Sequence, residues 1–229
     1  MKHKHGKKYR KIQETLKKEV YSLQEGIVKA KESTYAKFDE SVDVNVVLGI
    51  DPTKGEHVVR GSVVLPHGVG KISRVLVFAK GEYADAAKAA GADFVGAEDL
   101  IEKVLGGWMD FTHAVATPDL MGLVGKVAKI LGPRGLLPNK KLGTVTFDVA
   151  TAVSELKEGK LFFKNDKNGA VNFMFGKASF TPDKLKSNLV TFLKALSAAK
   201  PASSKGVFLK KITIATTMGP GIQISGDVE

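Results

Sequence analysis

Four short polar segments of this chain carry side chains that could recognise a folded nucleic acid. Lysines suit phosphates, hydroxyls and amides suit riboses, and aromatic or thioether groups suit exposed bases. The segment 216–221, Thr-Thr-Met-Gly-Pro-Gly, combines hydroxyls, a thioether and bare backbone, which suits contact with an RNA backbone or base; an ordinary turn is the alternative. The side chains of these kinds are Lys37, Phe38, Lys164, Asn165, Lys167, Ser179, Thr216, Thr217 and Met218.

A fifth segment, residues 119–143, combines an apolar helical pattern with a basic loop. Its apolar residues recur at three- and four-residue steps and predict an amphipathic helix that ends at Gly132-Pro133. The loop that follows is rich in glycine and proline, which favours a defined shape. Two interpretations are open: a second RNA-facing patch, or an element that packs the domains together. The basic residues concerned are Arg134, Lys140 and Lys141.

The net charge of the 229-residue chain is +11, and it is unevenly distributed. Residues 67–159 contain 11 basic and 11 acidic residues, so this middle stretch is neutral. The flanks, 1–66 and 160–229, hold the remaining 24 basic and 13 acidic residues. Basic surfaces favour polyanions. We therefore expect the flanks to bind the polyanion. The basic amino-terminal segment is either a solvated arm or a phosphate-contacting one.

Other chemistries find little support in the sequence. There is no cysteine, which excludes disulfides and thiolate metal sites and fits a reducing cytoplasm. The phosphate-loop pattern fails around Gly70-Lys71, because Ile72 follows the lysine. The histidines beyond the amino-terminal segment form no spaced metal pair, so an enzyme is a weak alternative. Binding to a membrane surface is a weaker alternative still, because the carboxy-terminal helix is short. We expect no catalytic residue, metal or cofactor, and no membrane partner. RNA is preferred to DNA because no DNA-binding motif is present.

The pattern of elements predicts two α/β domains. Between 74 and 157 strands and helices alternate, which predicts a mostly parallel sheet with helices on both faces. The flanks predict strands at 42–50, 57–65 and 208–217, a hairpin at 161–175 and a helix from Pro182. We expect two domains. Residues 1–66 and 160–229 together form a discontinuous α/β sandwich built from both chain ends. Residues 67–159 form an inserted Rossmann-like three-layer domain.

Several strings along nearly the whole chain resemble the large-subunit ribosomal protein L-one family of bacterial type, the protein of the ribosome's mobile side stalk. They are HGKKYR, AKFDE, LGIDP, VRG, LPHG, GWMDF, ATPDLMG, LGPRGLLPNKK, FKNDKNGA, GKASF and TTMGPG.

The resemblance implies the two-domain fold described above and a set of partners. Members bind large-subunit ribosomal RNA directly, form the mobile stalk near the tRNA exit site and help to release deacylated tRNA. Many also repress translation of their own operon messenger RNA. The resemblance further implies a monomer within the ribosome, in the cytoplasm.

The family's RNA contacts, carried over motif by motif, fall in the polar segments already described. This chain has Ala215 where we expect a threonine in other members, which weakens the case for a hydroxyl contact there. The residues implied are Lys37, Phe38 and Glu40, then Lys164, Asn165 and Lys167, then Ser179, and finally Thr216, Thr217, Met218 and Gly219.

Overall fold

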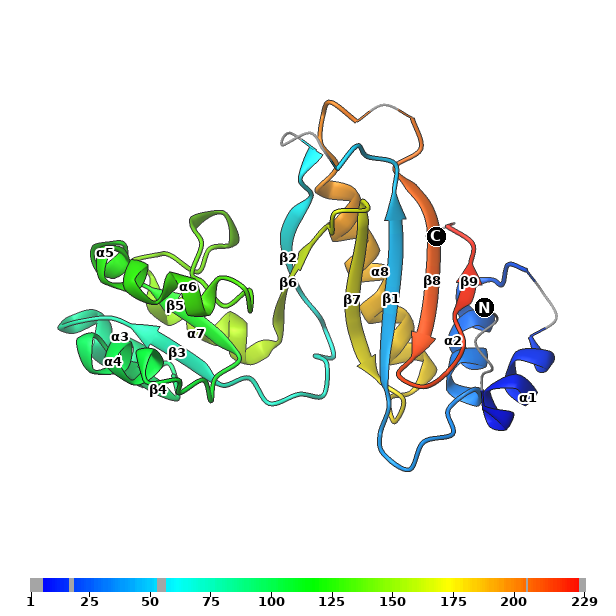
Figure 1. The fold of residues 1–229 in the computed structure, drawn as a ribbon, viewed down its shortest axis with the longest axis horizontal. Coiled ribbons are helices and arrows are strands. Elements are labelled where there is room, and N and C mark those ends of the chain that lie inside the picture. Colours follow the sequence, from blue (N-terminus) through cyan, green and yellow to red (C-terminus); the bar gives the residue numbers. More distant parts are fainter. Residues whose placement is uncertain (1–5, 17–18, 53–56, 205, 227–229) are drawn as a thin grey trace. The chain divides into compact units, whose positions relative to one another are not determined.

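The computed structural model describes residues 6–16, 19–52, 57–204 and 206–226. The chain forms two compact units. Unit 1 comprises residues 1–70 and 162–229, and unit 2 comprises residues 71–161. Both units mix helices and strands, as the predicted fold class requires (Figure 1).

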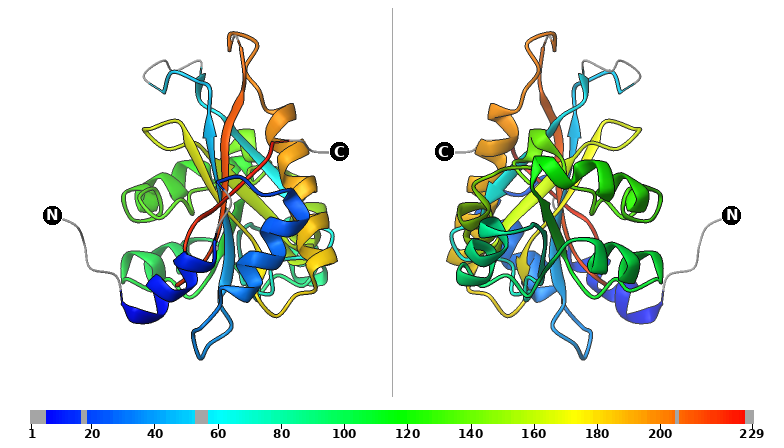
Figure 2. Two further views of the ribbon diagram at one scale, coloured as in Figure 1. Left: turned by 90° about the vertical axis from the view of Figure 1, so that its right-hand side faces the viewer. Right: turned by 90° about the vertical axis from the view of Figure 1, so that its left-hand side faces the viewer.

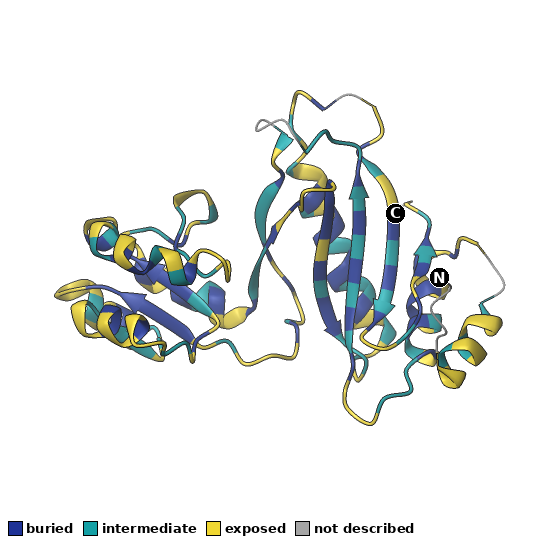
Figure 3. Cartoon of the chain, in the orientation of Figure 1, coloured by how far each residue is buried: buried dark blue, intermediate teal, exposed yellow. Residues whose placement is uncertain are grey.

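A four-stranded antiparallel sheet forms the centre of unit 1. Its strand order is β7-β1-β8-β9, so β1 lies between strands that follow it in sequence only after the insertion. Alternate residues of β1 are buried, as the period-two pattern predicts (Figure 3). The strands are β1 (Ser41–Leu48), β7 (Ala170–Lys177), β8 (Leu209–Thr216) and β9 (Ile222–Ile224), with a separate pair β2 (Arg60–Val64) and β6 (Lys160–Lys164).

Helices α2 (Leu23–Glu32) and α8 (Pro182–Ala198) cover one face of this sheet (Figure 2). The apolar stripe of α8, which includes Leu185, Leu189 and Leu196, is fully buried. The ring of Phe192 stacks on Phe173 of the sheet with centroids 4.1 Å apart. A further helix, α1 (Lys7–Thr15), buries no residue.

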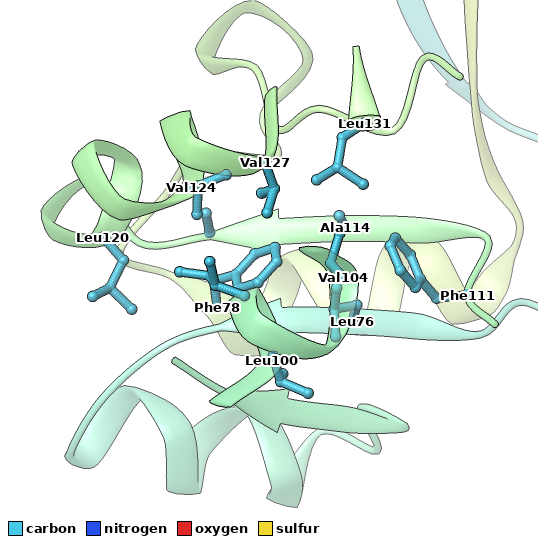
Figure 4. Packing of buried hydrophobic residues seen from close by; sticks show 12 residues of the cluster. Leu76, Phe78, Leu100, Val104, Phe111, Ala114, Leu120, Val124, Val127 and Leu131 are labelled. Atoms are coloured by element: carbon cyan, nitrogen blue, oxygen red, sulfur yellow. The ribbon is translucent and has the colours of Figure 1, made fainter. Parts of the chain in front are cut away.

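Unit 2 is a three-layer α/β structure with a parallel sheet of order β4-β3-β5. One face of the sheet packs its buried residues against α4, α5 and α6 (Figure 4), while α3 and α7 contact the strands as well as each other. The elements are β3 (Val75–Phe78), α3 (Glu82–Ala89), β4 (Phe94–Gly96), α4 (Glu98–Leu105), β5 (His113–Ala116), α5 (Met121–Val124), α6 (Ala128–Leu131) and α7 (Val149–Glu158).

The predicted helix over 119–131 is wrong in detail. The segment is a succession of short turns: η2 (Pro118–Leu120), α5, η3 (Gly125–Val127) and α6. Two glycines lower its helix propensity, and Val127 leaves the helical region with a ψ of 0°. As a result Val124 and Leu131 are buried, while Leu123 and Ile130 are only partly buried.

Two further predictions about strands need correction. The predicted alternation of strands and helices between 74 and 157 is incomplete, because residues 144–147 form only a single bridge, between Val145 and Ala116, in place of a strand. The predicted hairpin of 161–175 is also absent: β7 pairs with β1, β6 pairs with β2, and a single bridge links Asn165 to Val171. The polar turn between β6 and β7 therefore joins strands of different sheets.

The first crossing between the units falls after Gly70, four residues later than predicted. The cause is Asn188, a fully buried residue of α8. Its side chain accepts a hydrogen bond from the His67 backbone N–H at 3.2 Å and donates to the carbonyls of Gly68 and Phe175, each at 2.9 Å. These bonds keep residues 67 and 68 on unit 1. The second crossing falls after Leu161 rather than Gly159.

No helix among the described residues is long and apolar enough to cross a membrane.

Replacing Asn188 with leucine should destabilise unit 1 by about 2 kcal/mol, because it removes the partner of the buried Phe175 carbonyl and of two partly buried backbone groups, at His67 and Gly68. Urea unfolding followed by circular dichroism measures this change. Lys184→Leu, on the exposed side of the same helix, is the control and should change the midpoint little. An Asn188→Leu variant as stable as the wild type would show that these bonds do not hold the crossing in place.

Candidate nucleic-acid interface

The buried carboxylate of Glu40 lies at the centre of the candidate interface, at the start of β1. Its side chain is only 1% exposed. One oxygen accepts hydrogen bonds from the backbone N–H groups of Tyr35 at 3.1 Å and Ala36 at 2.9 Å. The other accepts from the backbone N–H of Met218 at 3.1 Å. Glu40 therefore connects two loops, 33–40 and 217–219, and its carboxylate is already occupied within the protein.

Burial raises the pKa of the Glu40 carboxyl, but the three backbone donors outweigh it and lower the pKa below the ordinary value of 4.5. The hydroxyl of Thr216 lies close to the carboxylate and adds to the lowering. Its geometry falls short of a hydrogen bond, and this hydroxyl is buried without a hydrogen-bond partner among the described residues. Thr216 is thus an interior residue of the site.

Close packing beside Thr216 requires glycine at position 219. A side-chain Cβ at this position would collide with the Thr216 hydroxyl and would lie 3.0 Å from the Ser33 hydroxyl. Its backbone N–H donates to the Thr216 carbonyl at 3.2 Å, which closes the turn. Glycine therefore lets the 217–219 turn fold back closely against the end of β8 and the end of α2.

The remaining residues of this end present side chains to solvent. Thr217 extends the sheet: its hydroxyl accepts from the Ser41 N–H at 3.0 Å, and its own N–H donates to the Ser41 carbonyl at 3.1 Å. Phe38 is 57% exposed and Met218 is 47% exposed. Two apolar side chains held in solvent beside a hydroxyl form a surface on which a base could stack. Lys37 is also exposed.

Ser179 joins this cluster through Asp39. The Ser179 hydroxyl donates to one carboxylate oxygen at 2.9 Å, and its backbone N–H donates to the other at 3.1 Å. Lys177 donates to the Asp39 carbonyl at 3.1 Å. The Tyr35 hydroxyl donates to the Met218 carbonyl at 3.0 Å.

Sequence reasoning missed Tyr35, Asp39 and Lys177. Asp39 lies inside AKFDE and Lys177 inside GKASF, so the motifs could have suggested these two. Tyr35 precedes AKFDE and nothing in the sequence marks it.

Lys164, Asn165 and Lys167 do not join this cluster. They lie beyond the other end of β1, since Ala170 pairs with Val47 whereas Lys177 pairs with Ser41. The seven residue steps from Ser41 to Leu48 correspond to roughly 23 Å. The predicted contacts of unit 1 therefore form two groups: the Glu40 end (Lys37, Phe38, Glu40, Ser179 and Thr216–Gly219) and the Lys164 end (Lys164, Asn165 and Lys167).

Asn165 has a structural role at its end of the sheet. It is 8% exposed, and its side-chain oxygen accepts from the Val59 N–H at 2.9 Å while its amide donates to the Asp166 carbonyl at 3.0 Å. Lys164 and Lys167 are exposed and supply the positive charge.

The basic loop of unit 2 has a fixed shape. Asn139 accepts from the Lys141 N–H at 2.8 Å through its side chain, and its own N–H donates to the Thr144 hydroxyl at 2.8 Å. The short turn η4 (Lys140–Leu142) lies between them. Arg134, Lys140 and Lys141 are all exposed. Among the residues that the structure describes, no group of acidic or histidine side chains could hold a metal ion.

Replacing Glu40 with glutamine tests whether the buried carboxylate holds the two loops. The folded pKa is lowered, so the carboxylate stabilises unit 1 above pH 4.5, and that contribution is lost as the pH falls through the folded pKa. Glu40→Gln should therefore be about 1–3 kcal/mol less stable at pH 7, because its amide nitrogen faces a backbone donor. It should also lose less stability on acidification than the wild type.

Urea unfolding at pH 7 and pH 4 checks both parts of this prediction. Glu14→Gln, on the exposed surface of α1, is the matched control. Wild-type stability of Glu40→Gln at pH 7 would contradict the assigned role.

Comparison with known proteins places the chain in a family. The model of the ribosomal protein L1p/L10e family matches residues 28–220. The chain is 52% identical to the large ribosomal subunit protein uL1 of Desulfotalea psychrophila over 222 residues, which cover 96% of this chain and 94% of that protein. It is 51% identical to the uL1 protein of Nitratidesulfovibrio vulgaris over the same shares of both chains. The chain therefore belongs to the ribosomal protein L1p/L10e family.

Proposed function

We propose that this chain, a structural protein of the large ribosomal subunit, binds ribosomal RNA directly through unit 1. The observation that carries the proposal is the Glu40 end of the sheet. There an exposed phenyl ring, a thioether and a hydroxyl are held in place by a buried carboxylate rather than by flexible surface chains. A preorganised surface loses little entropy on binding and suits recognition of RNA by shape.

The Lys164 end adds an electrostatic contribution to the same binding. Its exposed lysines suit phosphates, which supply affinity without sequence information. An RNA that contacts both ends must extend over roughly 23 Å, which favours a folded RNA of fixed shape over a short single strand. We propose the stalk region of the large-subunit ribosomal RNA as this ligand, and a similar structure in the chain's own operon messenger RNA as a second one.

Unit 2 has a different task in this proposal. Its exposed Arg134, Lys140 and Lys141 stand on a fixed loop of a unit whose charges otherwise sum to less than zero, and we assign them to contact with tRNA at the exit site. On this view the protein is a monomer within the cytoplasmic ribosome, where it assists release of deacylated tRNA. The enzyme alternative is disfavoured, since the candidate site consists of structural hydrogen bonds and exposed apolar groups with no arrangement for general acid or base chemistry.

Thr217→Ala and Met218→Asp should each weaken binding to a labelled stalk fragment without unfolding the protein. The alanine variant loses a hydroxyl contact, and the aspartate variant places negative charge against phosphate. A loss of about 1–3 kcal/mol, or roughly 5- to 150-fold in Kd, is expected for each. Filter binding with excess tRNA as competitor measures it.

Thr217→Ser keeps the hydroxyl and should bind nearly as the wild type does. Thr151→Ala, on an exposed position of α7, should be silent. Unchanged affinity in both Thr217→Ala and Met218→Asp would place the RNA site elsewhere.

Lys164→Ala and Lys167→Ala should each reduce the slope of log affinity against log salt by about one, since each removes one phosphate contact. Titrations between low and physiological salt give the slope. Lys103→Ala, on α4 of the neutral unit, is the control. If both slopes match that of the wild type, the Lys164 end does not touch RNA.

A further inference from the structure

The sheet of unit 1 has a second face that the proposed interface leaves unused. Helices α2 and α8 both contact the sheet and each other, so they lie on one side of it (Figure 2). No described element of unit 1 lies across the opposite face, which is turned toward the viewer in Figure 1. On β1 this open face carries Ser41, Asp43, Asn45 and Val47, all partly exposed.

A row of polar side chains crosses this open face at the middle of the sheet. The strand register places Asn172 of β7 opposite Asn45 of β1, Asn45 opposite Thr213 of β8, and Thr213 opposite Gln223 of β9. The Asn45 amide donates to the side-chain oxygen of Asn172. That bond uses one donor of Asn45 and the oxygen of Asn172, so the pair still offers an amide oxygen and N–H groups to a ligand.

The row ends at a hollow beside β9. This hollow of about 200 Å³ is lined by Lys211, Thr213 and Gln223 on the sheet, with Leu16 and Glu19 on its other side. Leu16 directly follows α1.

Helix α1 brings positive charge to the same side of unit 1. Its exposed basic residues are Lys7, Lys8, Arg10 and Lys11. The ammonium of Lys8 lies 6.0 Å from the centroid of the Tyr35 ring, which places α1 beside the loop that carries Phe38.

The open face also connects the two ends of the proposed interface. Ser41 and Lys177 lie at the Glu40 end, and Val47 with Ala170 lies at the Lys164 end. An RNA that reaches both ends along the shortest path must cross the row of amides between them. Amide and hydroxyl side chains are the groups that read ribose 2′-hydroxyls and phosphates, whereas the centre of a protein–protein interface is enriched in aromatic residues, Met and Arg, none of which belongs to this row.

We propose that the open face of the unit 1 sheet is an RNA-binding surface in its own right, on which Asn45, Asn172, Thr213, Gln223 and Lys211 contact the ribose-phosphate backbone. The proposal rests on the proposed function, and it adds residues that lie outside the two groups already described. It also makes β1 the axis along which the RNA lies.

Side-chain amide resonances of the full-length protein give a direct test with the stalk RNA fragment. On addition of RNA, the NH₂ signals of Asn45, Asn172 and Gln223 should shift or broaden, and that of Gln24, on the exposed surface of α2, should stay in place. Gln223→Glu should weaken binding roughly fivefold, about the effect of one lost hydrogen bond. Gln24→Glu introduces the same charge on the covered side and should bind as the wild type does.

Lys211→Ala should lower the salt slope by about one, and Lys184→Ala should leave it unchanged. The outcomes separate the two proposals. If the wild type binds and Thr217→Ala weakens it, yet the three amides stay in place and Gln223→Glu binds normally, the open-face surface is overturned and the proposed function stands. If the wild type fails to bind the fragment, both are overturned.

Discussion

The burial of one carboxylate at the start of β1 is the constraint on which the candidate interface depends. A buried charge without partners costs several kcal/mol, so Glu40 is tolerated only while Ala36, Tyr35 and Met218 donate to it. Met218 lies 178 residues away in sequence. The carboxylate therefore cannot be satisfied locally, and the exposed positions of Phe38 and Met218 are fixed only when both ends of the chain have folded together.

The insertion of unit 2 likewise makes unit 1 depend on both ends of the chain. Strand β1 is paired on both sides by strands that lie after the insertion, so neither flank of the chain can complete the sheet alone. The sheet of unit 2 uses only consecutive segments of the chain. The contacts most distant in sequence, such as that of Tyr35 with Met218 across 183 residues, thus lie in unit 1. The scaffold of the candidate interface is therefore the part of the protein with the larger loop-closure entropy to overcome.

Much of the fold could be predicted from local patterns, because periodicity and end signals are local properties. Helix α8 begins at Pro182 as predicted, and β1 follows its alternating pattern. The pairing of the strands could not be predicted as well. The turn residues 165–169 indicate a hairpin between β6 and β7, but β6 pairs with β2 and β7 pairs with β1. The motifs predict candidate residues for an interface, but they do not predict that Glu40, Thr216 and Asn165 are buried, since burial depends on the distant segments that cover them.

The two ends of the sheet differ in the balance of fit and charge, and this difference explains how one small unit could both select and hold an RNA. At the Glu40 end the exposed groups include a hydroxyl, a thioether and a phenyl ring, whose contacts depend on fit and are little screened by salt, together with the Lys37 ammonium. At the Lys164 end the exposed groups are ammonium ions, whose attraction for phosphate is screened within about 10 Å at 0.1 M salt. The distance between the ends exceeds that length, so the charges at one end cannot substitute for poor fit at the other. An RNA of the wrong shape could satisfy either end but not both, and selectivity then follows from the rigidity of the strand that joins them.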